Sequence, residues 1–469
     1  MRSPTQPQSA AASHWHYGFL AVAALLAISL HTPASAAVRW GTGMGNKNPT
    51  QTDVQNDFGS AGMNCKSLRL DAKASDIEPT QGTFNWSATD GKISTLVNAG
   101  VGANVVLCVT GGATPPAWMC SGYPAGIPNP DLFDDFFFAV MDRYSKAPYN
   151  VKFFEVYNEA NYQFTELVPN DHRSRANHYF LILQKAWNRT ATLRSANPAI
   201  KVIGGVTAGA PISKRASDND FFDQFWNVKG GWQYLNYYSF HLYIRGADVG
   251  GSGYVAPEFQ FGNPNRGLLW TDILVPSSQV NWHSKEVWLT ELGYDSADAS
   301  MGGTQTIRWD NQARWQVRAA IIMRGAPTNF IKRFLQFNAY WDDPVDDEAY
   351  GFREGVNGTK KPQWHAWKTL NSVIDDTVTN IEMKAYYQVT SPTTNICNFK
   401  YTKSNGYYGW AVWWVPAGGS GTVYLGSGAV TGAVYTRTMK ATSWTFLGNY
   451  SNQSVQVTAT NDPLYVEVR

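Results

Sequence analysis

The sequence predicts an α/β fold, namely a closed (β/α)8 TIM barrel followed by a small C-terminal antiparallel β-sandwich. From Val38 onward, about 340 residues alternate between short apolar runs and stretches with helical spacing, as βα units do. From about Asp376 to the end, short alternating runs separated by Gly, Ser, Asn and Pro are typical of antiparallel strands. Eight βα units in roughly 250 to 340 residues fit a closed barrel better than an open sheet.

Residues 1–36 have the pattern of a signal peptide. Arg2 is their only strongly charged residue, an apolar run follows at 19–30, and the small residues at 34–36 provide a cleavage site, so the mature chain would start at Ala37. The run of about 12 residues is short for a membrane span, and a signal anchor is the alternative. No later stretch is long and apolar enough to span a membrane, so we expect a secreted or periplasmic protein without stable membrane insertion after signal cleavage.

The barrel is expected over residues 37–375, with eight candidate strands in order. These strands are predicted at 38–43, 66–71, 103–109, 151–157, 201–206, 237–243, 286–291 and 332–340. Helical spacing is clearest at 173–196 and 304–324, and the last barrel helix is expected around 362–374.

Residues 376–469 are expected to form the sandwich. Trp410, Trp413 and Trp414 in this part can bind sugar or pack against the barrel, and packing is the favoured interpretation. No low-complexity linker separates the two parts, so we expect them to pack together.

Composition excludes some classes of partner. A formal net charge of +2 over 469 residues does not favour nucleic acid or an anionic membrane surface. The Gly-rich segment after the first strand resembles a dinucleotide-binding turn only superficially, because Asn48 and Pro49 follow it instead of an apolar helix start. Aromatic residues make up 14% of the chain, which suits stacking on sugars, although large barrels also bury many aromatic side chains.

The four cysteines, Cys65, Cys108, Cys120 and Cys397, do not have the spacing of a metal site. In an oxidising compartment Cys108 and Cys120 can close a disulfide loop after a strand, and four free buried thiols are the alternative. No cluster of histidines and carboxylates has ligand spacing either, so we expect no metal and no other cofactor.

Two glutamates lie where an apolar, strand-like run gives way to a loop. Glu159 closes the fourth candidate strand and Glu291 the seventh. Active sites of such barrels lie at the carboxyl ends of the strands, and hydrolysis of a glycosidic bond requires a pair of carboxylates. A structural, paired carboxylate is the alternative for either residue. The pair nevertheless predicts a glycoside hydrolase.

Three motifs resemble those of a known group of enzymes. Tyr157-Asn158-Glu159 is similar to the strand-four Asn-Glu motif of glycoside hydrolase clan A, and Leu289-Thr290-Glu291 is similar to the strand-seven nucleophile motif of that clan. His241 and Tyr243 resemble the sixth-strand His-x-Tyr of the family 39 group. The resemblance covers the whole barrel in order and spacing.

The resemblance implies roles for these residues. Glu159 would be the general acid/base, protonated near neutral pH through partial burial and repulsion from Glu291, and Glu291 would be the nucleophile of a retaining reaction. Asn158 would bind the sugar 2-hydroxyl, and Arg69 would lie beside Glu291 and lower its pKa, with an ion pair to a rim acid such as Asp71 as the alternative.

Four further side chains are candidates for supporting roles. Tyr243 would donate to Glu291, and His241 would bind the sugar or serve as a core histidine. Trp341 matches the aromatic floor of the first sugar subsite, and Trp118 is a candidate second wall, with core packing as the alternative.

The chain departs from the clan pattern where Tyr157 and Ala160 flank the Asn-Glu pair in place of the usual Trp and Pro. The sugar specificity of family 39 is therefore not transferred. The expected function is retaining hydrolysis of β-linked poly- or oligosaccharides, without an obligate protein partner. A non-catalytic carbohydrate-binding protein and a transglycosylase are the alternatives.

Overall fold

The computed structural model describes most of the chain beyond the expected signal peptide. The described residues are 39–43, 50–60, 62–65, 67–101, 104–164, 167, 171–211, 220–244, 253–258, 273–326, 330–337, 342, 349–355, 358–384, 396–415 and 419–469. Trp341 and the expected signal peptide lie outside these ranges. Within them, no helix combines the length and apolar character that a membrane crossing requires.

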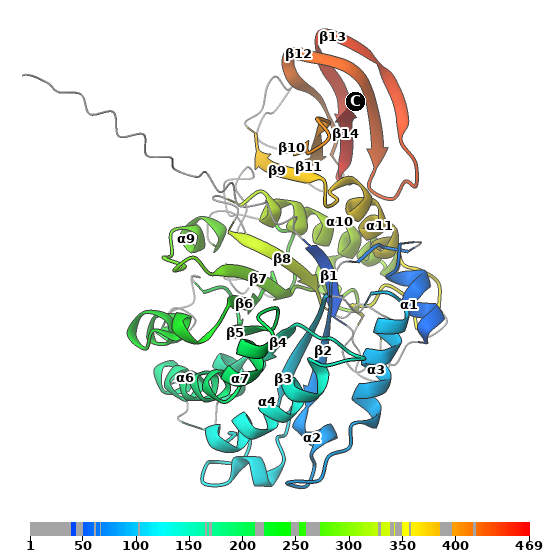
Figure 1. Ribbon diagram of the computed structural model, residues 1–469. Helices are drawn as coiled ribbons and strands as arrows, with labels where there is room; N and C mark the ends of the chain where they lie inside the picture. The colour runs from blue at the N-terminus through cyan, green and yellow to red at the C-terminus, as the bar shows by residue number, and fades with distance from the viewer. Residues whose placement is uncertain are drawn as a thin grey trace, which may run out of the picture. The chain divides into compact units, whose positions relative to one another are not determined.

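Eight parallel strands close into a barrel in sequence order (Figure 1). They are β1 Arg39–Gly43, β2 Ser67–Lys73, β3 Val105–Thr110, β4 Phe153–Val156, β5 Lys201–Ala208, β6 Tyr237–His241, β7 Glu286–Glu291 and β8 Ile331–Gln336. Pairing of Trp40 in β1 with Phe334 in β8 completes the ring. The predicted (β/α)8 barrel is confirmed.

Helices cover the barrel between the strands (Figure 1). The α-helices are α1 Gln51–Asp57, α2 Ala74–Ile77, α3 Ser87–Asn98, α4 Pro130–Tyr144, α5 Ala160–Gln163, α6 His172–Arg189, α7 Ala191–Ala196, α9 Val275–Ser278, α10 Gln305–Arg324 and α11 Pro362–Val373. Shorter 3-10 or π turns are η2 Ala117–Cys120, η3 Asp223–Val228, η4 Gly231–Tyr234 and η7 Ala299–Met301.

Local sequence explains several of these boundaries. Helix α4 starts where the Asn129 side chain accepts from the backbone of Asp131, with Pro130 in the first turn. The helix predicted at 173–196 is divided at Thr190, whose hydroxyl donates to the Ala186 carbonyl at 2.7 Å. Such back-bonding competes with the helical ladder, which explains why two helices replace one.

Six antiparallel strands follow the barrel in one continuous sheet, in the order β13-β12-β14-β11-β10-β9. They are β9 Val378–Met383, β10 Ile396–Lys403, β11 Tyr408–Trp414, β12 Gly421–Thr438, β13 Thr445–Ala459 and β14 Leu464–Val468. The pairing of β12 with β13 shifts register at three places between Leu425 and Tyr435, and such bulges bend strands. Val423 and Leu425, at the start of β12, share a core with Trp410 and Val412 of β11. The two layers of the predicted sandwich are thus parts of one bent sheet.

A buried ion pair joins the barrel to this sheet. Glu258, which follows β6, lies 3.3 Å from Arg318 of α10 and accepts from the indole of Trp413 at 2.7 Å. Arg318 also donates to the carbonyl of Trp414 at 3.0 Å. Trp410, Trp413 and Trp414 are all buried. Trp413 packs in the core that includes the barrel, as favoured from the sequence, whereas Trp410 and Trp414 pack in the core of the sheet itself.

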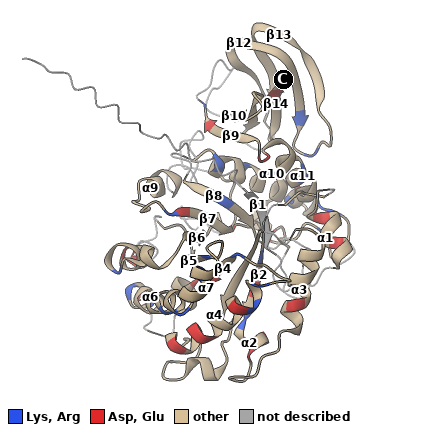
Figure 2. Cartoon of the chain, in the orientation of Figure 1, with Lys and Arg blue, Asp and Glu red and all other residues tan. Residues whose placement is uncertain are grey.

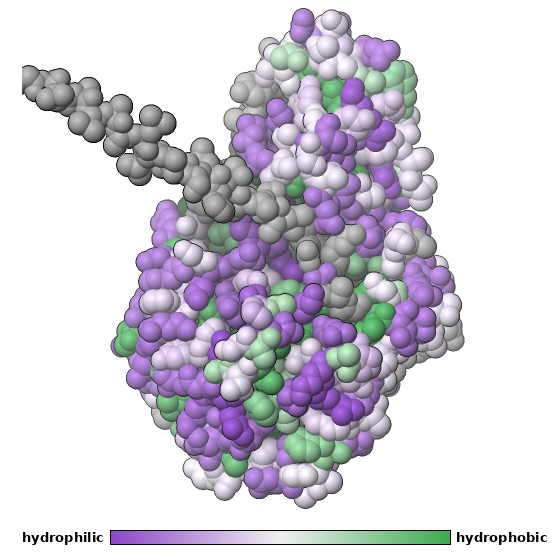
Figure 3. All heavy atoms as spheres, in the orientation of Figure 1, coloured by the Kyte–Doolittle hydropathy of each residue, from purple (hydrophilic) through white to green (hydrophobic). Residues whose placement is uncertain are grey.

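The charged residues are spread over many elements, and Figure 2 shows both signs without a face of a single sign in this view. On the face shown in Figure 3, apolar residues are interspersed with polar ones. This distribution agrees with the near-neutral net charge of +2.

Candidate active site

Glu159 and Glu291 face each other at the carboxyl end of the barrel. Glu159 follows β4, and Glu291 is the last residue of β7. One oxygen of each carboxylate and one ring nitrogen of His241, at the end of β6, all lie within 4.8 Å of one another. The barrel therefore brings together two carboxylates that are far apart in the sequence.

Arg69 of β2 connects the site to the barrel interior. Its Nη1 donates to Glu291 Oε1 at 2.6 Å, its Nε to Glu155 Oε2 at 2.6 Å, and its Nη2 to Asn158 Oδ1 at 2.8 Å. It also lies 3.7 Å from Asp71, so the contact with Glu291 and the ion pair with a rim acid both exist. A guanidinium group can make these contacts at once because its donors form a planar fork.

Glu155 is a fully buried acid below this arginine, as its strand position predicts. Besides Arg69 it accepts hydrogen bonds from the hydroxyls of Ser239 at 2.7 Å and Thr290 at 2.9 Å. Sequence reasoning missed both hydroxyls. Ser239 was detectable, because it lies two residues before His241 and so faces the same side of the strand.

His241 is buried, and its Nδ1 lies 2.8 Å from Glu159 Oε1 and 3.4 Å from Glu291 Oε2. Its Nε2 is also buried and has no hydrogen-bond partner among the described residues. The contacts with the two carboxylates involve Nδ1 alone, and the expected hydrogen bond from His241 to a sugar stays a prediction.

Tyr243 donates its hydroxyl to Glu291 Oε2 at 2.8 Å, which matches the predicted contact. Burial and the charge of Glu291 raise the pKa of Tyr243, so it remains a hydroxyl donor. Because Arg69 donates to Oε1, both carboxylate oxygens of Glu291 accept hydrogen bonds. Such hydrogen bonds favour the charged form of a carboxylate and fix its orientation.

The backbone around the Asn-Glu pair is strained. Tyr157 and Glu159 both adopt positive φ angles, of 67° and 44°. A non-glycine residue in this region costs roughly 1–3 kcal/mol, and such strain concentrates at functional sites. The turn is held in place by Asn161, whose side-chain amide exchanges two hydrogen bonds with the backbone of Ala208, at 2.9 and 2.8 Å.

Contacts as well as burial set the pKa values of the three central groups. Burial raises the pKa of Glu159, but the hydrogen bond and charge of His241 outweigh it and leave the pKa below its ordinary value. Burial raises the pKa of Glu291, which the charges of His241 and Arg69 do not fully offset. Burial lowers the pKa of His241, whereas Glu291 and Glu159 raise it, and the net result lies above the ordinary value.

These directions differ from the expectation that Glu159 alone holds the acid proton and that Glu291 has a lowered pKa. The reason is the position of His241, which the sequence does not reveal. Because the three groups lie within 4.8 Å of one another, they titrate as a coupled set.

The same three residues have the ligand types and spacing that could hold a metal ion. The fixed positive charge of Arg69, 2.6 Å from Glu291, opposes a second cation at that carboxylate. The donor set therefore suits an uncharged polar ligand better than a metal.

The possible disulfide between Cys108 and Cys120 is not formed, and all four cysteines are buried thiols outside any disulfide. The Cys108 thiol lies inside the barrel and donates to the carbonyl of Tyr157 at 3.3 Å, whereas Cys120 lies in η2 beyond the strand. Burial raises the pKa of both thiols, which disfavours the reactive thiolate.

Trp118 is half-buried, packs against the core and donates its indole N–H to the carbonyl of Glu78 at 2.9 Å. Its role as a sugar wall stays a prediction. Trp341 lies outside the described residues, so its predicted role also stays a prediction.

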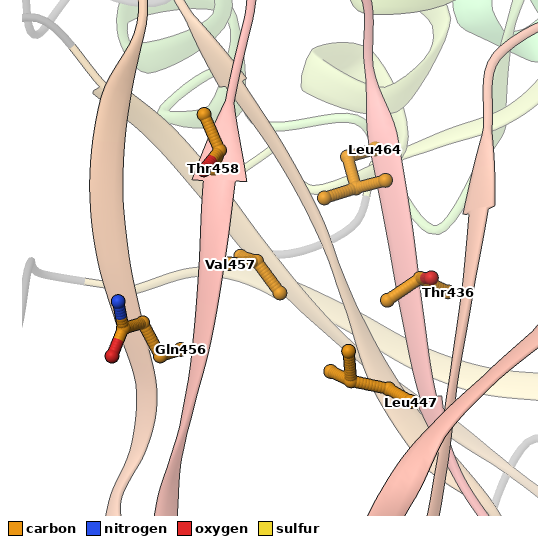
Figure 4. A pocket seen from close by; sticks show the side chains of 6 residues that line it. All are labelled: Thr436, Leu447, Gln456, Val457, Thr458 and Leu464. Carbon is orange, nitrogen blue, oxygen red and sulfur yellow. The ribbon is translucent and has the colours of Figure 1, made fainter.

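A hollow of about 480 Å³ lies in the C-terminal sheet (Figure 4). Its lining residues are Thr436, Leu447, Gln456, Val457, Thr458 and Leu464. The lining has neither an aromatic ring nor a charged group, so it lacks the stacking surface that sugars favour.

Comparison with solved structures shows the same fold in glycoside hydrolases. A family 39 glycoside hydrolase from the gut symbiont Bacteroides cellulosilyticus WH2 matches with a TM-score of 0.64 and 15% identity, over 93% of this chain and 82% of that one. The catalytic domain of GH30 xylanase C from Talaromyces cellulolyticus matches with a TM-score of 0.58 and 14% identity, over 92% and 96% of the two chains. The GH30 subfamily 8 xylanase Xyn30A from Clostridium acetobutylicum matches with a TM-score of 0.56 and 12% identity, over 92% and 96%.

A family model described as beta-galactosidase, of glycoside hydrolase family 42, matches residues 47–131, a minor part of the chain. No curated protein matches the chain in sequence. The fold is thus that of clan A glycoside hydrolases, which confirms the resemblance predicted from the strand-end motifs.

Proposed function

We propose that the chain is a secreted retaining glycoside hydrolase that cleaves β-glycosidic bonds in a poly- or oligosaccharide. The observation that carries this proposal is the proximity of Glu159 and Glu291, which have carboxylate oxygens within 4.8 Å of each other. Retaining enzymes place the two carboxyl groups about 5–5.5 Å apart, whereas inverting enzymes leave about 6.5–9.5 Å for a water molecule. The geometry supports double displacement.

In the first step, Glu291 attacks the anomeric carbon while Glu159 protonates the leaving oxygen. The contacts of Arg69 and Tyr243 orient Glu291 and favour its ionised form. The bond between the anomeric carbon and the leaving oxygen breaks, and an ester between the sugar and Glu291 forms.

The acid proton reaches Glu159 from His241 across their 2.8 Å hydrogen bond. A bound sugar covers the site and excludes water, which disfavours the charged imidazolium–carboxylate pair relative to the neutral pair. Proton transfer from Nδ1 of His241 to Glu159 gives that neutral pair and prepares the acid.

In the second step, the ionised Glu159 takes a proton from water, which attacks the anomeric carbon and releases Glu291. The two inversions restore the original configuration. Asn158 assists both steps, because its Oδ1 accepts from Arg69 and its amide N–H2 is left to donate to the sugar 2-hydroxyl.

The proposal also includes export. Residues 1–36 contain the charged Arg2, an apolar run and a cleavage site of small residues. These features support cleavage before Ala37. The mature chain would then consist of the barrel to residue 375 and the bent sheet from 376.

The proposal is tested with the mature protein and a panel of β-linked glucans, xylans and galactans. The wild type should release oligosaccharides from at least one of them, and Glu291→Gln should still bind that glycan but not cleave it. Binding without cleavage by the wild type would instead establish the non-catalytic carbohydrate-binding protein. Products longer than the substrate at high acceptor concentration would establish the transglycosylase.

A further inference from the structure

Two exposed aromatic rings of the barrel lie on its catalytic end. Among the described barrel residues, the aromatic side chains with more than a third of their surface exposed are Phe84 at 39%, Tyr123 at 37% and Tyr162 at 69%. They lie in the segments that follow β2, β3 and β4, respectively. The loops after the strands of a barrel line its active-site face. Phe84, however, stacks on Trp86, which packs against Tyr144 at the end of α4, where the chain turns back towards the start of β4. Tyr123 and Tyr162 are therefore the exposed rings assigned to the active-site face.

Tyr162 is the ring closest in the chain to the proposed acid. It lies in α5, a single helical turn that begins directly after Glu159, and its backbone N–H donates to the Glu159 carbonyl at 2.8 Å. Glu159 is the left-handed cap of this turn, so the hydrogen bond keeps Tyr162 within one turn of it in space. The Tyr162 ring is 69% exposed directly beside the residue proposed as the acid.

The turn that carries Tyr162 is rigid. Its neighbour Asn161 is buried and holds the end of β5 through two hydrogen bonds to Ala208. Arg175 of α6 donates to the carbonyl of Asn161 at 2.9 Å. A ring on a fixed support loses little entropy when a ligand stacks on it, so this exposed position is well suited to binding.

We propose that Tyr162 forms the first binding subsite for the sugar on the leaving-group side of the bond, and that Tyr123 extends this surface. The inference rests on the proposed function, because the general acid defines the side on which the leaving group departs. The substrate is then a β-linked chain that continues beyond the cleaved bond on the leaving-group side, instead of a single sugar on a small aglycone.

The test compares two substrates of the same sugar. One is the β-linked oligosaccharide that the wild type cleaves most efficiently, and the other is the matching glycosyl fluoride, whose leaving group has no sugar to stack. Tyr162→Ala should lower kcat/KM for the oligosaccharide about tenfold, equivalent to about 1.4 kcal/mol, and leave the fluoride within about twofold. Tyr162→Phe keeps the ring and should stay within about twofold on both substrates.

Phe446→Ala provides the matched control, because Phe446 is 54% exposed and lies in β13 of the C-terminal sheet. It should leave both substrates unchanged. Equal kcat/KM of Tyr162→Ala and wild type on the oligosaccharide would overturn the inference, and so would equal losses on both substrates. Failure of the wild type to cleave either substrate would overturn the proposed function itself, so the two failures are distinguishable.

Discussion

Nδ1 of His241 lies 2.8 Å from Oε1 of Glu159, so a buried imidazole shares a hydrogen bond with the proposed acid. The same nitrogen lies 3.4 Å from Glu291. One ring therefore links the two carboxylates that must exist in opposite protonation states during the first step. This link leads to a testable pH dependence.

His241→Gln should move the alkaline limb of the pH profile to lower pH. Burial lowers the pKa of His241, but Glu291 and Glu159 raise it above the ordinary value of 6.5, so the wild-type rate should fall only above that pH. In the variant only Glu159 can hold the acid proton, and a carboxyl loses it at lower pH. The measurement is kcat/KM against pH, and an unchanged alkaline limb would show that His241 does not hold the proton.

Tyr243→Phe should move the acid limb to higher pH. The reactive form of Glu291 is ionised, so activity is lost as the pH falls through its pKa. Burial raises this pKa and the Tyr243 hydrogen bond lowers it, so removal of the hydroxyl raises it further. The acid limb of kcat/KM reports the shift, and an acid limb at the wild-type position would contradict Glu291 as the group that must be ionised.

Glu159→Gln should reduce cleavage of natural linkages by roughly 10²–10⁴-fold, the usual contribution of a general acid. Substrates with leaving groups that need no protonation, such as dinitrophenyl glycosides, should keep their first-step rate. The measurement is pre-steady-state release of the leaving group from both substrates. Equal losses on the two would contradict the acid role.

Arg69→Met should destabilise the fold as well as reduce activity. It leaves the fully buried Glu155 without its charge partner, and breaking a buried pair costs roughly 3–5 kcal/mol. Burial raises the pKa of Glu155, but Arg69 and His241 lower it below its ordinary value, so the stabilisation is present at neutral pH and lost as the pH falls through the pKa.

Urea unfolding at pH 7 and pH 4 measures this effect. The difference in the free energy of unfolding between wild type and Arg69→Met should narrow at the lower pH, because the buried, unpaired Glu155 of the variant takes up a proton there. Arg69→Lys is the matched control: it keeps the charge and should lose less stability, although it cannot make all three hydrogen bonds. If the difference in the free energy of unfolding is the same at both pH values, an ion pair is not its cause.

The barrel was predictable because its strands are apolar runs of ordinary length between helices. All eight predicted strands overlap β1 to β8. The fourth strand ends at Val156, one residue earlier than predicted, because Tyr157 adopts a positive φ that no apolar pattern signals.

The C-terminal sheet was harder to predict in detail. None of the first ten residues of β13 is buried, so this part lacks the alternation that marks a strand with one buried face. β12 is a single strand of 18 residues, whereas the sequence predicted short runs in the C-terminal part, because the bulges that bend it interrupt the alternating pattern. Both features depend on the strand partner and not on local sequence.

The candidate site, too, was predictable from the sequence only in part. Arg69 and Tyr243 contact Glu291 as predicted, because strand ends and motif order determine which side chains meet at the barrel mouth. The position of His241 between two carboxylates depends on distances of a few tenths of an ångström across three strands. The directions of the three pKa shifts follow from those distances, so they could not be deduced from the sequence.

The most direct test of double displacement by Glu159 and Glu291 is the anomeric form of the first product. Proton NMR during early cleavage of a β-linked substrate resolves the α and β anomers before they equilibrate in water. The carboxylate spacing within 4.8 Å predicts that the β anomer appears first. Initial appearance of the α anomer would contradict Glu291 as the nucleophile.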